Sequence, residues 1–156
     1  MALTLELVPV AASRYGYVRK PFDPTPWFKD SWWVGDAKAP ELLFGSFVHE
    51  EHGEVARVQV NPQSTTGAAY PTWVAPNAWL AEVDLFEVRP DLQGQGAGHE
   101  AMGLLVPRLQ PPVIALSLNA RAADFWRALG WDEHVHPDAP NHPPPRHMAS
   151  LFAWLG

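Results

Sequence analysis

Three glycines at alternate positions, Gly94, Gly96 and Gly98, form the segment of this sequence best suited to holding a ligand. Glycine has no side chain, so the backbone N–H groups of such a loop can turn toward a bound group and approach it closely. The residues after the loop have helical spacing, and a helix start adds free N–H groups and a positive dipole end. The pattern predicts a pyrophosphate site.

Two other phosphate-binding loops also use glycines, but each needs residues that this chain lacks. The dinucleotide pattern G-x-G-x-x-G requires glycine where His99 stands, and an acidic residue about 20 positions further on. No Asp or Glu lies between Glu100 and Asp124. The P-loop requires Gly-Lys-Ser/Thr, and no lysine follows Lys38. An ordinary glycine-rich turn remains as the alternative.

Three carboxylates, Glu82, Asp84 and Glu87, lie in one predicted strand directly before this loop. A strand predicted to be central in a sheet is normally apolar, so three carboxylates in it are an exception, and such exceptions concentrate at functional sites. Strand alternation places Glu82 and Asp84 on one face, whereas Glu87 points the other way in a regular strand. Burial would raise the pKa of either carboxyl toward that of a general base. The alternative is pairing with an arginine or exposure to solvent.

The elements that position these residues follow from apolar alternation and helical spacing. Asn119 can cap a second helix that Gly130 ends, and the first helix should kink or stop at Pro107. A short helix around 25–33 is also expected, with Pro26 in its first turn. The order predicts an α/β (α+β) fold whose mixed central sheet is antiparallel in its N-terminal half and parallel around the glycine-loop helix. Strands are predicted at 3–10, 42–48, 55–60, 79–88, 113–116, 131–135 and 148–155, and the first helix at 98–109.

The composition limits the class of protein. The 156 residues suit a single domain over 1–156, and 47% hydrophobic residues can form a core. A net charge of −6 argues against a nucleic-acid partner. The absence of cysteine excludes thiolate nucleophiles and cysteine zinc sites, and no metal site is expected. No apolar run of about 18 residues and no signal peptide is present, so we expect a cytoplasmic protein without a membrane partner.

Two blocks of the chain carry a family motif. The first is Val88-Arg89-Pro90 followed by Gln93 through Gly98, which matches V-x-P and then [Q/R]-x-x-G-x-[G/A]. The second is Asn119 after a strand, then Phe125 through Trp131, where the family has F-Y-x-x-x-G-F. Both blocks resemble the GNAT superfamily of acetyl-CoA-dependent N-acetyltransferases. The resemblance covers about 41–131, while 11–40, where the family usually has two helices, fits poorly.

The resemblance implies acetyl-CoA as cosubstrate and a set of residues that bind it. Loop amides from Gln95 to His99 would hold the pyrophosphate, and main-chain groups of Phe86 and Val88 would pair with the pantetheine arm. The Val88 amide would polarise the thioester carbonyl, and Asn119 would contact the cofactor arm. The cofactor-binding residues are thus expected to be Phe86, Val88, Gln93, Gly94, Gln95, Gly96, Ala97, Gly98, His99 and Asn119.

The resemblance also implies an acyltransferase that acetylates a primary amine of a small molecule or peptide by direct attack in a ternary complex. Ala81-Glu82-Val83 resembles the "A-E-I" of the histone-acetylating branch, where the glutamate is the general base, and Asp84 is a second candidate. Trp126 replaces the tyrosine that is the family's frequent general acid, and an indole is no usable acid. Nothing in the sequence places the remaining tyrosines, Tyr15, Tyr17 and Tyr70.

That replacement keeps a second function open, a non-catalytic module that binds CoA or acyl-CoA and acts through protein contacts. The sequence is compatible with a homodimer but does not determine the oligomeric state. Aromatic residues of the N-terminal region either line an acceptor pocket, where they could hold a cation, or pack in the core. They include Trp27, Phe28, Trp32 and Trp33.

Overall fold

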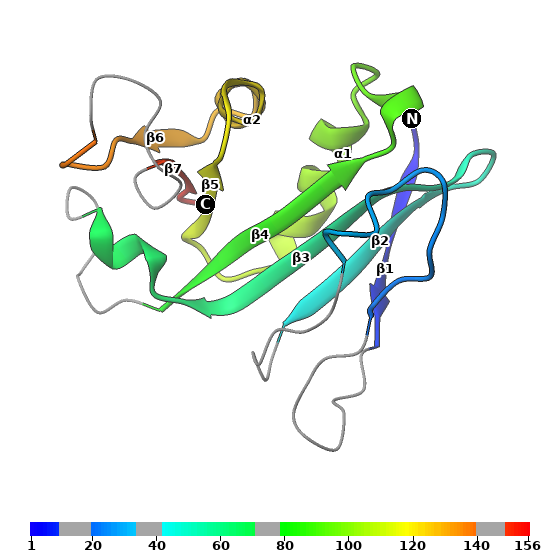
Figure 1. Ribbon diagram of the computed structural model, residues 1–156, viewed down its shortest axis with the longest axis horizontal. Coiled ribbons are helices and arrows are strands. Elements are labelled where there is room, and N and C mark those ends of the chain that lie inside the picture. Colours follow the sequence, from blue (N-terminus) through cyan, green and yellow to red (C-terminus); the bar gives the residue numbers. More distant parts are fainter. Residues whose placement is uncertain (10–19, 34–41, 71–78, 140–148) are drawn as a thin grey trace. The chain divides into compact units, whose positions relative to one another are not determined.

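The computed structural model describes residues 1–9, 20–33, 42–70, 79–139 and 149–156 (Figure 1). The chain divides into two compact units, residues 1–61 with 84–108 and residues 62–83 with 109–156. Strands β3 (Gly53–Ser64) and β4 (Leu80–Val88) each continue along the chain from one unit into the other. A single domain over 1–156 remains a prediction.

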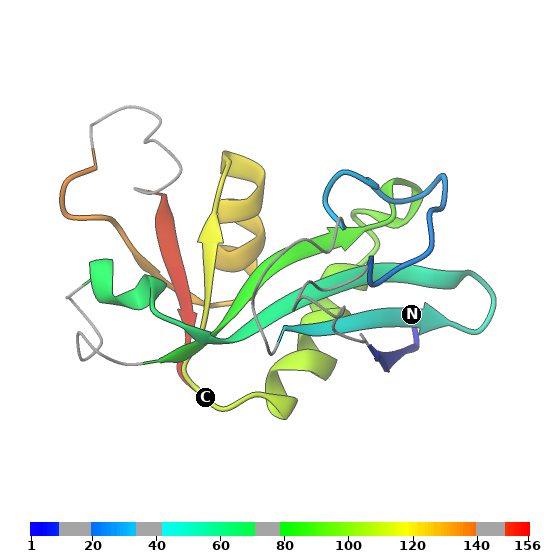
Figure 2. The same ribbon diagram turned by 60° about the horizontal axis from the view of Figure 1, so that its bottom comes forward.

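The strands form a mixed sheet, as the sequence predicts. Hydrogen-bonded neighbours follow the order β1-β2-β3-β4-β5-β7-β6 (Figures 1 and 2). β1 pairs antiparallel with β2 and β2 with β3, whereas β4 and β5 are parallel. β7 then pairs antiparallel with both β5 and β6. The other bounds are β1 (Leu3–Val8), β2 (Leu43–His49), β5 (Val113–Ser117), β6 (Asp132–His134) and β7 (Ser150–Trp154).

In the first unit, helix α1 (Ala97–Leu105) follows the glycine loop and packs on β1. Its buried face consists of Ala97, Ala101, Met102 and Leu105. The Leu3 amide donates a hydrogen bond of 2.7 Å to Glu100 Oε1, which joins the first strand to this helix. The helix ends before the 3-10 turn η3 (Val106–Arg108), which contains Pro107. The predicted stop at this proline is therefore confirmed.

Residues 20–33, which we call the strap, contain no α-helix, so the helix expected around 25–33 is wrong. In a helix the Lys29 amide would donate to the carbonyl of residue 25, but it donates to the Glu87 carboxylate at 3.0 Å. The strap turns instead through bonds such as the one from the Trp32 amide to the Lys29 carbonyl, 2.9 Å. Tertiary contacts have overridden the local helical pattern.

Strand β3 also runs further than expected, because Pro62 lies inside it rather than at its end. The register of β3 with β2 ends at the pair Leu43–Val60. Proline has no N–H to give to a ladder, so it is tolerated beyond the point where that ladder stops.

The second unit is organised around β5, β7 and helix α2 (Ala120–Ala128). Asn119 Oδ1 accepts a hydrogen bond of 2.8 Å from the Ala122 amide, which confirms the predicted cap. Gly130 follows the helix with φ of 78°, the left-handed conformation expected of a glycine that ends a helix. No helix in the described part of the chain is long and apolar enough to cross a membrane.

Candidate active site

The glycine loop adopts the conformation that its composition predicts. Gly94 and Gly96 have φ of 76° and 85°, in the left-handed region that residues with a Cβ rarely enter. A Cβ built on either glycine would meet no atom of the described residues within 4 Å. The backbone angle, not crowding, therefore requires glycine here. The loop from Gln93 to Gly96 is exposed and open to a ligand.

The start of α1 supplies donors beside this loop. Gly96 is the N-cap residue, and the Glu100 amide donates back to the Gly96 carbonyl at 3.1 Å. The amides of Ala97, Gly98 and His99 precede that first helical bond and have no partner in the helix ladder. Together with the helix dipole they form an arrangement that suits a pyrophosphate.

Two glutamines connect the loop to the residues before it, at the end of β4 and in the turn that follows. Gln93 Nε2 donates to the Val88 carbonyl at 2.9 Å, and Gln95 Nε2 donates to the Asp91 carbonyl at 3.0 Å. The structure thus brings the predicted residues Gln93 and Val88 together. Both glutamine side chains thus use their amide nitrogen within the protein.

The direction of the Val88 amide follows from its neighbour. The Arg89 amide donates to the Val55 carbonyl on β3 at 2.9 Å. Successive N–H groups of an extended chain point to opposite edges, so the Val88 N–H points away from β3. This is the direction in which a peptide-like arm could pair with β4, and Phe86 presents its main chain to the same edge by alternation.

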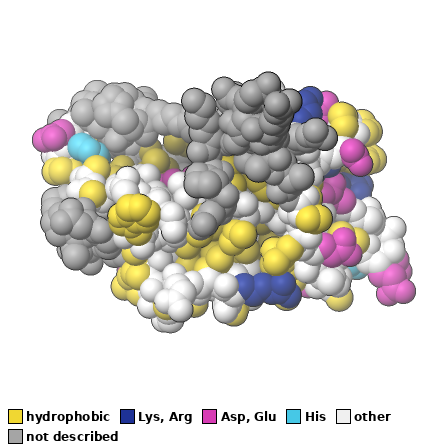
Figure 3. Space-filling view, turned by 90° about the horizontal axis from the view of Figure 1, so that it is seen from below, with side chains coloured by type: hydrophobic (Ala, Val, Ile, Leu, Met, Phe, Trp, Pro, Cys, Tyr) yellow, Lys and Arg dark blue, Asp and Glu magenta, His cyan; other side chains and the backbone are white. Residues whose placement is uncertain are grey.

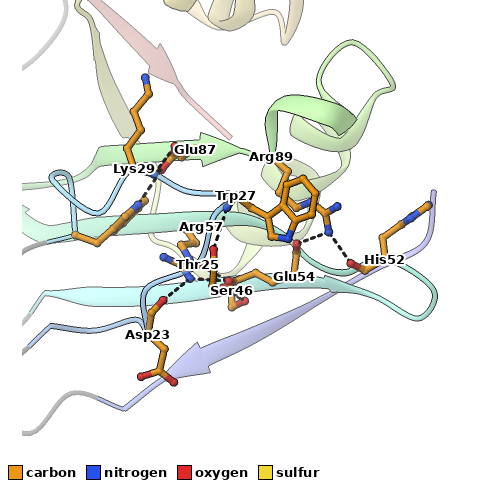
Figure 4. Close-up of polar contacts among 11 residues, drawn as sticks. Asp23, Thr25, Trp27, Lys29, Ser46, His52, Glu54, Arg57, Glu87 and Arg89 are labelled. Carbon is orange, nitrogen blue, oxygen red and sulfur yellow. Dashed lines mark hydrogen bonds and ion pairs between the residues drawn. The ribbon is translucent and has the colours of Figure 1, made fainter.

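Glu87 differs most from its sequence prediction. The side chain is 7% exposed and accepts hydrogen bonds from the Lys29 amide, at 3.0 and 3.2 Å, and from Trp33 Nε1, at 2.9 Å. Figure 4 shows Glu87 reaching from β4 to the strap. The sequence identifies Glu87 as one of three strand carboxylates but does not predict its partners, because one donor is a main-chain amide, which leaves no signal in residue identity.

Asp84 lies on the same side as Glu87, which a regular strand would not allow. Gln59 Nε2 donates to Asp84 Oδ2 at 3.3 Å, and Gln59 is the cross-strand partner of Phe44. Phe44 belongs to the apolar cluster that includes Trp33 and contacts Leu85. The consecutive residues Asp84 and Leu85 therefore both approach one face, so β4 departs from strict alternation there.

Glu82 belongs to the second unit, where it is 8% exposed and its register partner on β5 is Ile114. Tyr70 lies in the same unit and donates through its hydroxyl to the Ala149 carbonyl. Burial raises the pKa of Tyr70, and the Glu82 carboxylate raises it further. The structure thus places the one described tyrosine of the three near a candidate base, while Tyr15 and Tyr17 lie outside the described residues.

Trp126 fills the position of the missing tyrosine as a core residue. It is 5% exposed, and its ring lies 4.6 Å from that of Trp131 and 4.9 Å from that of Phe125. Asn119 uses its side-chain oxygen in the helix cap, so only its amide nitrogen remains for the predicted contact with a cofactor arm. Within the described ranges, no group of three or more His, Asp or Glu side chains could hold a metal ion.

The strap aromatics divide into buried and exposed members. Phe28 and Trp33 are buried at 6% and 2%, whereas Trp27 and Trp32 are 46% and 39% exposed. Hydrophobic side chains also reach the surface elsewhere, as Figure 3 shows. Lys29 Nζ lies 4.3 Å from the Trp32 ring and Arg89 Cζ 4.2 Å from the Trp27 ring, so both exposed indoles already contact a cation of the protein.

No protein-family model and no curated protein matches the sequence, whereas solved structures share its fold. A KacTA–DNA complex is 14% identical, covers 99% of this chain and 93% of its own, and has a TM-score of 0.61. AtaT complexed with acetyl-methionyl-tRNAfMet is 16% identical, with 99% and 95% covered and a TM-score of 0.55. The Bacillus subtilis N-acetyltransferase YlbP in complex with coenzyme A is 17% identical, with 78% and 71% covered and a TM-score of 0.51.

These neighbours are GNAT-fold acetyltransferases, and the chain has their fold. The fold class implied by the resemblance of its two sequence blocks is therefore confirmed. Two of the three structures are nucleic-acid complexes, which is at odds with the expectation that this chain has no nucleic-acid partner.

Proposed function

We propose that this chain, which has the GNAT fold, is an N-acetyltransferase that transfers an acetyl group from acetyl-CoA to a primary amine. The observation that carries the proposal is the loop from Gln93 to His99, where Gly94 and Gly96 have positive φ and the amides of an α-helix begin. Gln93 fixes this loop to the carbonyl of Val88. The loop proposed to hold the pyrophosphate thus begins five residues after Val88, which lies at the outward edge of β4.

The chain's own groups would bind the cofactor in an extended arrangement along β4. Loop amides from Gln95 to His99 would hold the pyrophosphate, and Phe86 and Val88 would pair with the pantetheine amides through their main chain. The amide nitrogen of Asn119 would contact the arm. Gln93 would act through its bond to Val88, by keeping the loop and the strand edge in register.

Acetyl-CoA supplies an activated acetyl thioester. The Val88 amide would donate to the thioester oxygen, where negative charge develops when the acceptor nitrogen attacks the carbonyl carbon. Glu82 or Asp84 would accept the proton that the amine loses, and water would protonate the sulfur when the carbon–sulfur bond breaks. The thiolate of a thiol with a pKa of about 8.5 can leave without a general acid. The reaction is therefore compatible with Trp126 at the position of the family's tyrosine.

Glu82 and Asp84 remain the candidate bases, and their surroundings support them differently. Glu82 is nearly buried, while Asp84 is half-buried and accepts from Gln59. The described residues include no arginine or lysine ion pair to Asp84. We expect alanine at the true base to lower turnover by about 10²-fold or more while acetyl-CoA affinity is unchanged. Full activity in both variants would exclude both residues.

The acceptor is proposed to be a small-molecule or peptide amine. The chain's net charge of −6 suits such an acceptor better than an amine carried by a nucleic acid. AtaT, complexed with acetyl-methionyl-tRNAfMet, motivates testing an aminoacyl-tRNA as well. A thiol-release assay with small amines, peptides and aminoacyl-tRNA separates these acceptor classes, and activity with the tRNA alone would overturn the proposed class.

The second function is a non-catalytic CoA or acyl-CoA module, which is favoured by one observation. The position of the family's acid is occupied by a buried tryptophan. Thermal unfolding with acetyl-CoA, CoA and NAD tests what the two functions share. Ligand at about 100 times its dissociation constant adds about 2.7 kcal/mol to the free energy of unfolding. No shift with either CoA form would exclude both functions, and a shift without thiol release from any acceptor would favour the module.

A further inference from the structure

Three consecutive residues at the end of β4, Glu87, Val88 and Arg89, combine two buried charges with the amide proposed to polarise the thioester. Glu87 is 7% and Arg89 8% exposed. Burial of a charge costs several kcal/mol unless hydrogen bonds compensate for it. The partners of these two side chains therefore determine how firmly the backbone between them is held.

Glu87 attaches the strap to β4. Its two oxygens accept from the Lys29 amide and the Trp33 indole, and both donors come from the strap (Figure 4). Trp33 is 2% exposed and packs edge-on against Phe22 at 5.0 Å, so its indole is fixed by packing as well as by the carboxylate. Glu87 is attached to β4 through its backbone and to the strap through its carboxylate, so it restricts the movement of the end of β4.

Arg89 holds the other side of Val88. Its Nη1 donates to the His52 carbonyl at 2.6 Å and to the Glu54 carbonyl at 3.3 Å, while Asp91 binds the remaining nitrogens. The strap covers this guanidinium too, through the ring of Trp27. The strap, the β2–β3 turn and β4 thus meet at two side chains that flank one residue.

We propose that Glu87 is a positioning residue, which fixes the direction of the Val88 amide by binding the strap to the end of β4. The inference rests on the proposed acetyl transfer and deepens it. An oxyanion donor must be aimed before the reaction begins, since a group that reorients during the reaction loses most of its benefit. In this chain the strap performs that task where the family usually has two helices.

The test compares Glu87→Gln with the wild type by amide NMR, titrating each with acetyl-CoA and with CoA. Glutamine keeps the shape but offers only one acceptor oxygen to two donors. In the wild type, the Val88 amide should shift with acetyl-CoA and much less with CoA, because CoA lacks the thioester carbonyl to which this amide is proposed to donate. In the variant this difference should be largely lost, while the amides from Gln95 to His99 shift as in the wild type.

A second variant guards against loss of the fold. Trp33→Phe removes the indole donor and keeps an aromatic ring, and it should reduce the Val88 difference in the same direction. Arg127→Ala, in an exposed ion pair on α2, is the control and should leave the difference unchanged. If the loop and Val88 amides respond in both Glu87→Gln and Trp33→Phe as in the wild type, the positioning role is excluded and the proposed function survives. If the wild-type loop amides do not respond to either ligand, the proposed function fails, and the positioning role with it.

Discussion

The glycine loop at 93–99 and the strap at 20–33 lie in the same unit and meet the end of β4 by opposite means. The loop uses backbone groups and is exposed, and its one side-chain bond to β4 comes from Gln93. The strap is held by buried charged side chains of the strands, Arg57 and Glu87, which bind its main chain. A backbone site is visible in sequence as glycine spacing, whereas side chains that capture distant main-chain groups leave no local pattern.

The largest effect should come from removing the carboxylate of Glu87 on β4, which binds the strap. Glu87→Ala leaves the buried Trp33 indole and the part-buried Lys29 amide without their acceptor, and each lost partner costs about 1–3 kcal/mol. We expect the free energy of unfolding to fall by about 2–4 kcal/mol in a denaturant titration. The matched control Glu50→Ala, an exposed glutamate of the β2–β3 turn, should have no measurable effect. Equal stability of the two variants would mean that the strap does not depend on Glu87.

A substitution in the glycine loop should weaken acetyl-CoA binding and leave the contacts of the strap unchanged. Gly96→Val places a β-branched residue at φ of 85°, a conformation that costs about 1–3 kcal/mol. The loop should relax toward negative φ and turn its amides away from the ligand. Isothermal titration calorimetry should show acetyl-CoA binding weakened by about tenfold or more. Wild-type affinity in this variant would show that the left-handed conformation is not needed for binding.

In the second unit, too, a side chain binds a main-chain group that is distant in sequence: the buried hydroxyl of Tyr70 donates to the Ala149 carbonyl. Burial, followed by the Glu82 carboxylate, raises the pKa of Tyr70 above its usual value near 10. Below about pH 10 the phenol is neutral in both states and its ionisation does not affect stability. Above that pH the unfolded chain ionises first, so the free energy of unfolding should fall by up to about 1.4 kcal/mol per pH unit.

In Tyr70→Phe, the fall in the free energy of unfolding that comes from ionisation of the phenol should be absent. Unfolding titrations of wild type and variant between pH 8 and pH 11 should converge as the pH rises, after an initial difference of about 1 kcal/mol from the lost hydrogen bond. Parallel curves throughout the range would show that Tyr70 does not titrate differently in the folded state.

The same contrast explains what the sequence could predict. Alternation and helical spacing located β4, α1 and α2, and the glycines located the loop, because each of these signals lies in neighbouring residues. The sequence predicts a helix around 25–33 because Pro26 suits a first turn, while the acceptor that captures the Lys29 amide, Glu87, lies 58 residues away. Strict alternation also puts Asp84 and Glu87 on opposite faces, whereas both approach the same face because β4 is irregular at Asp84 and Leu85.

The smallest expected effect is that of Gly103→Ala, which compares an ordinary helical glycine with the left-handed glycines of the loop. Gly103 lies within α1 at an exposed position, and a Cβ there would meet no described atom within 4 Å. It has no positive φ, unlike Gly94 and Gly96, so alanine fits its backbone. Gly103→Ala should raise the free energy of unfolding by about 0.5–1 kcal/mol through helix propensity and leave acetyl-CoA affinity unchanged. If this variant weakens binding as Gly96→Val does, the loop's affinity would depend on glycine content along α1, and left-handed geometry at the loop would not be its cause.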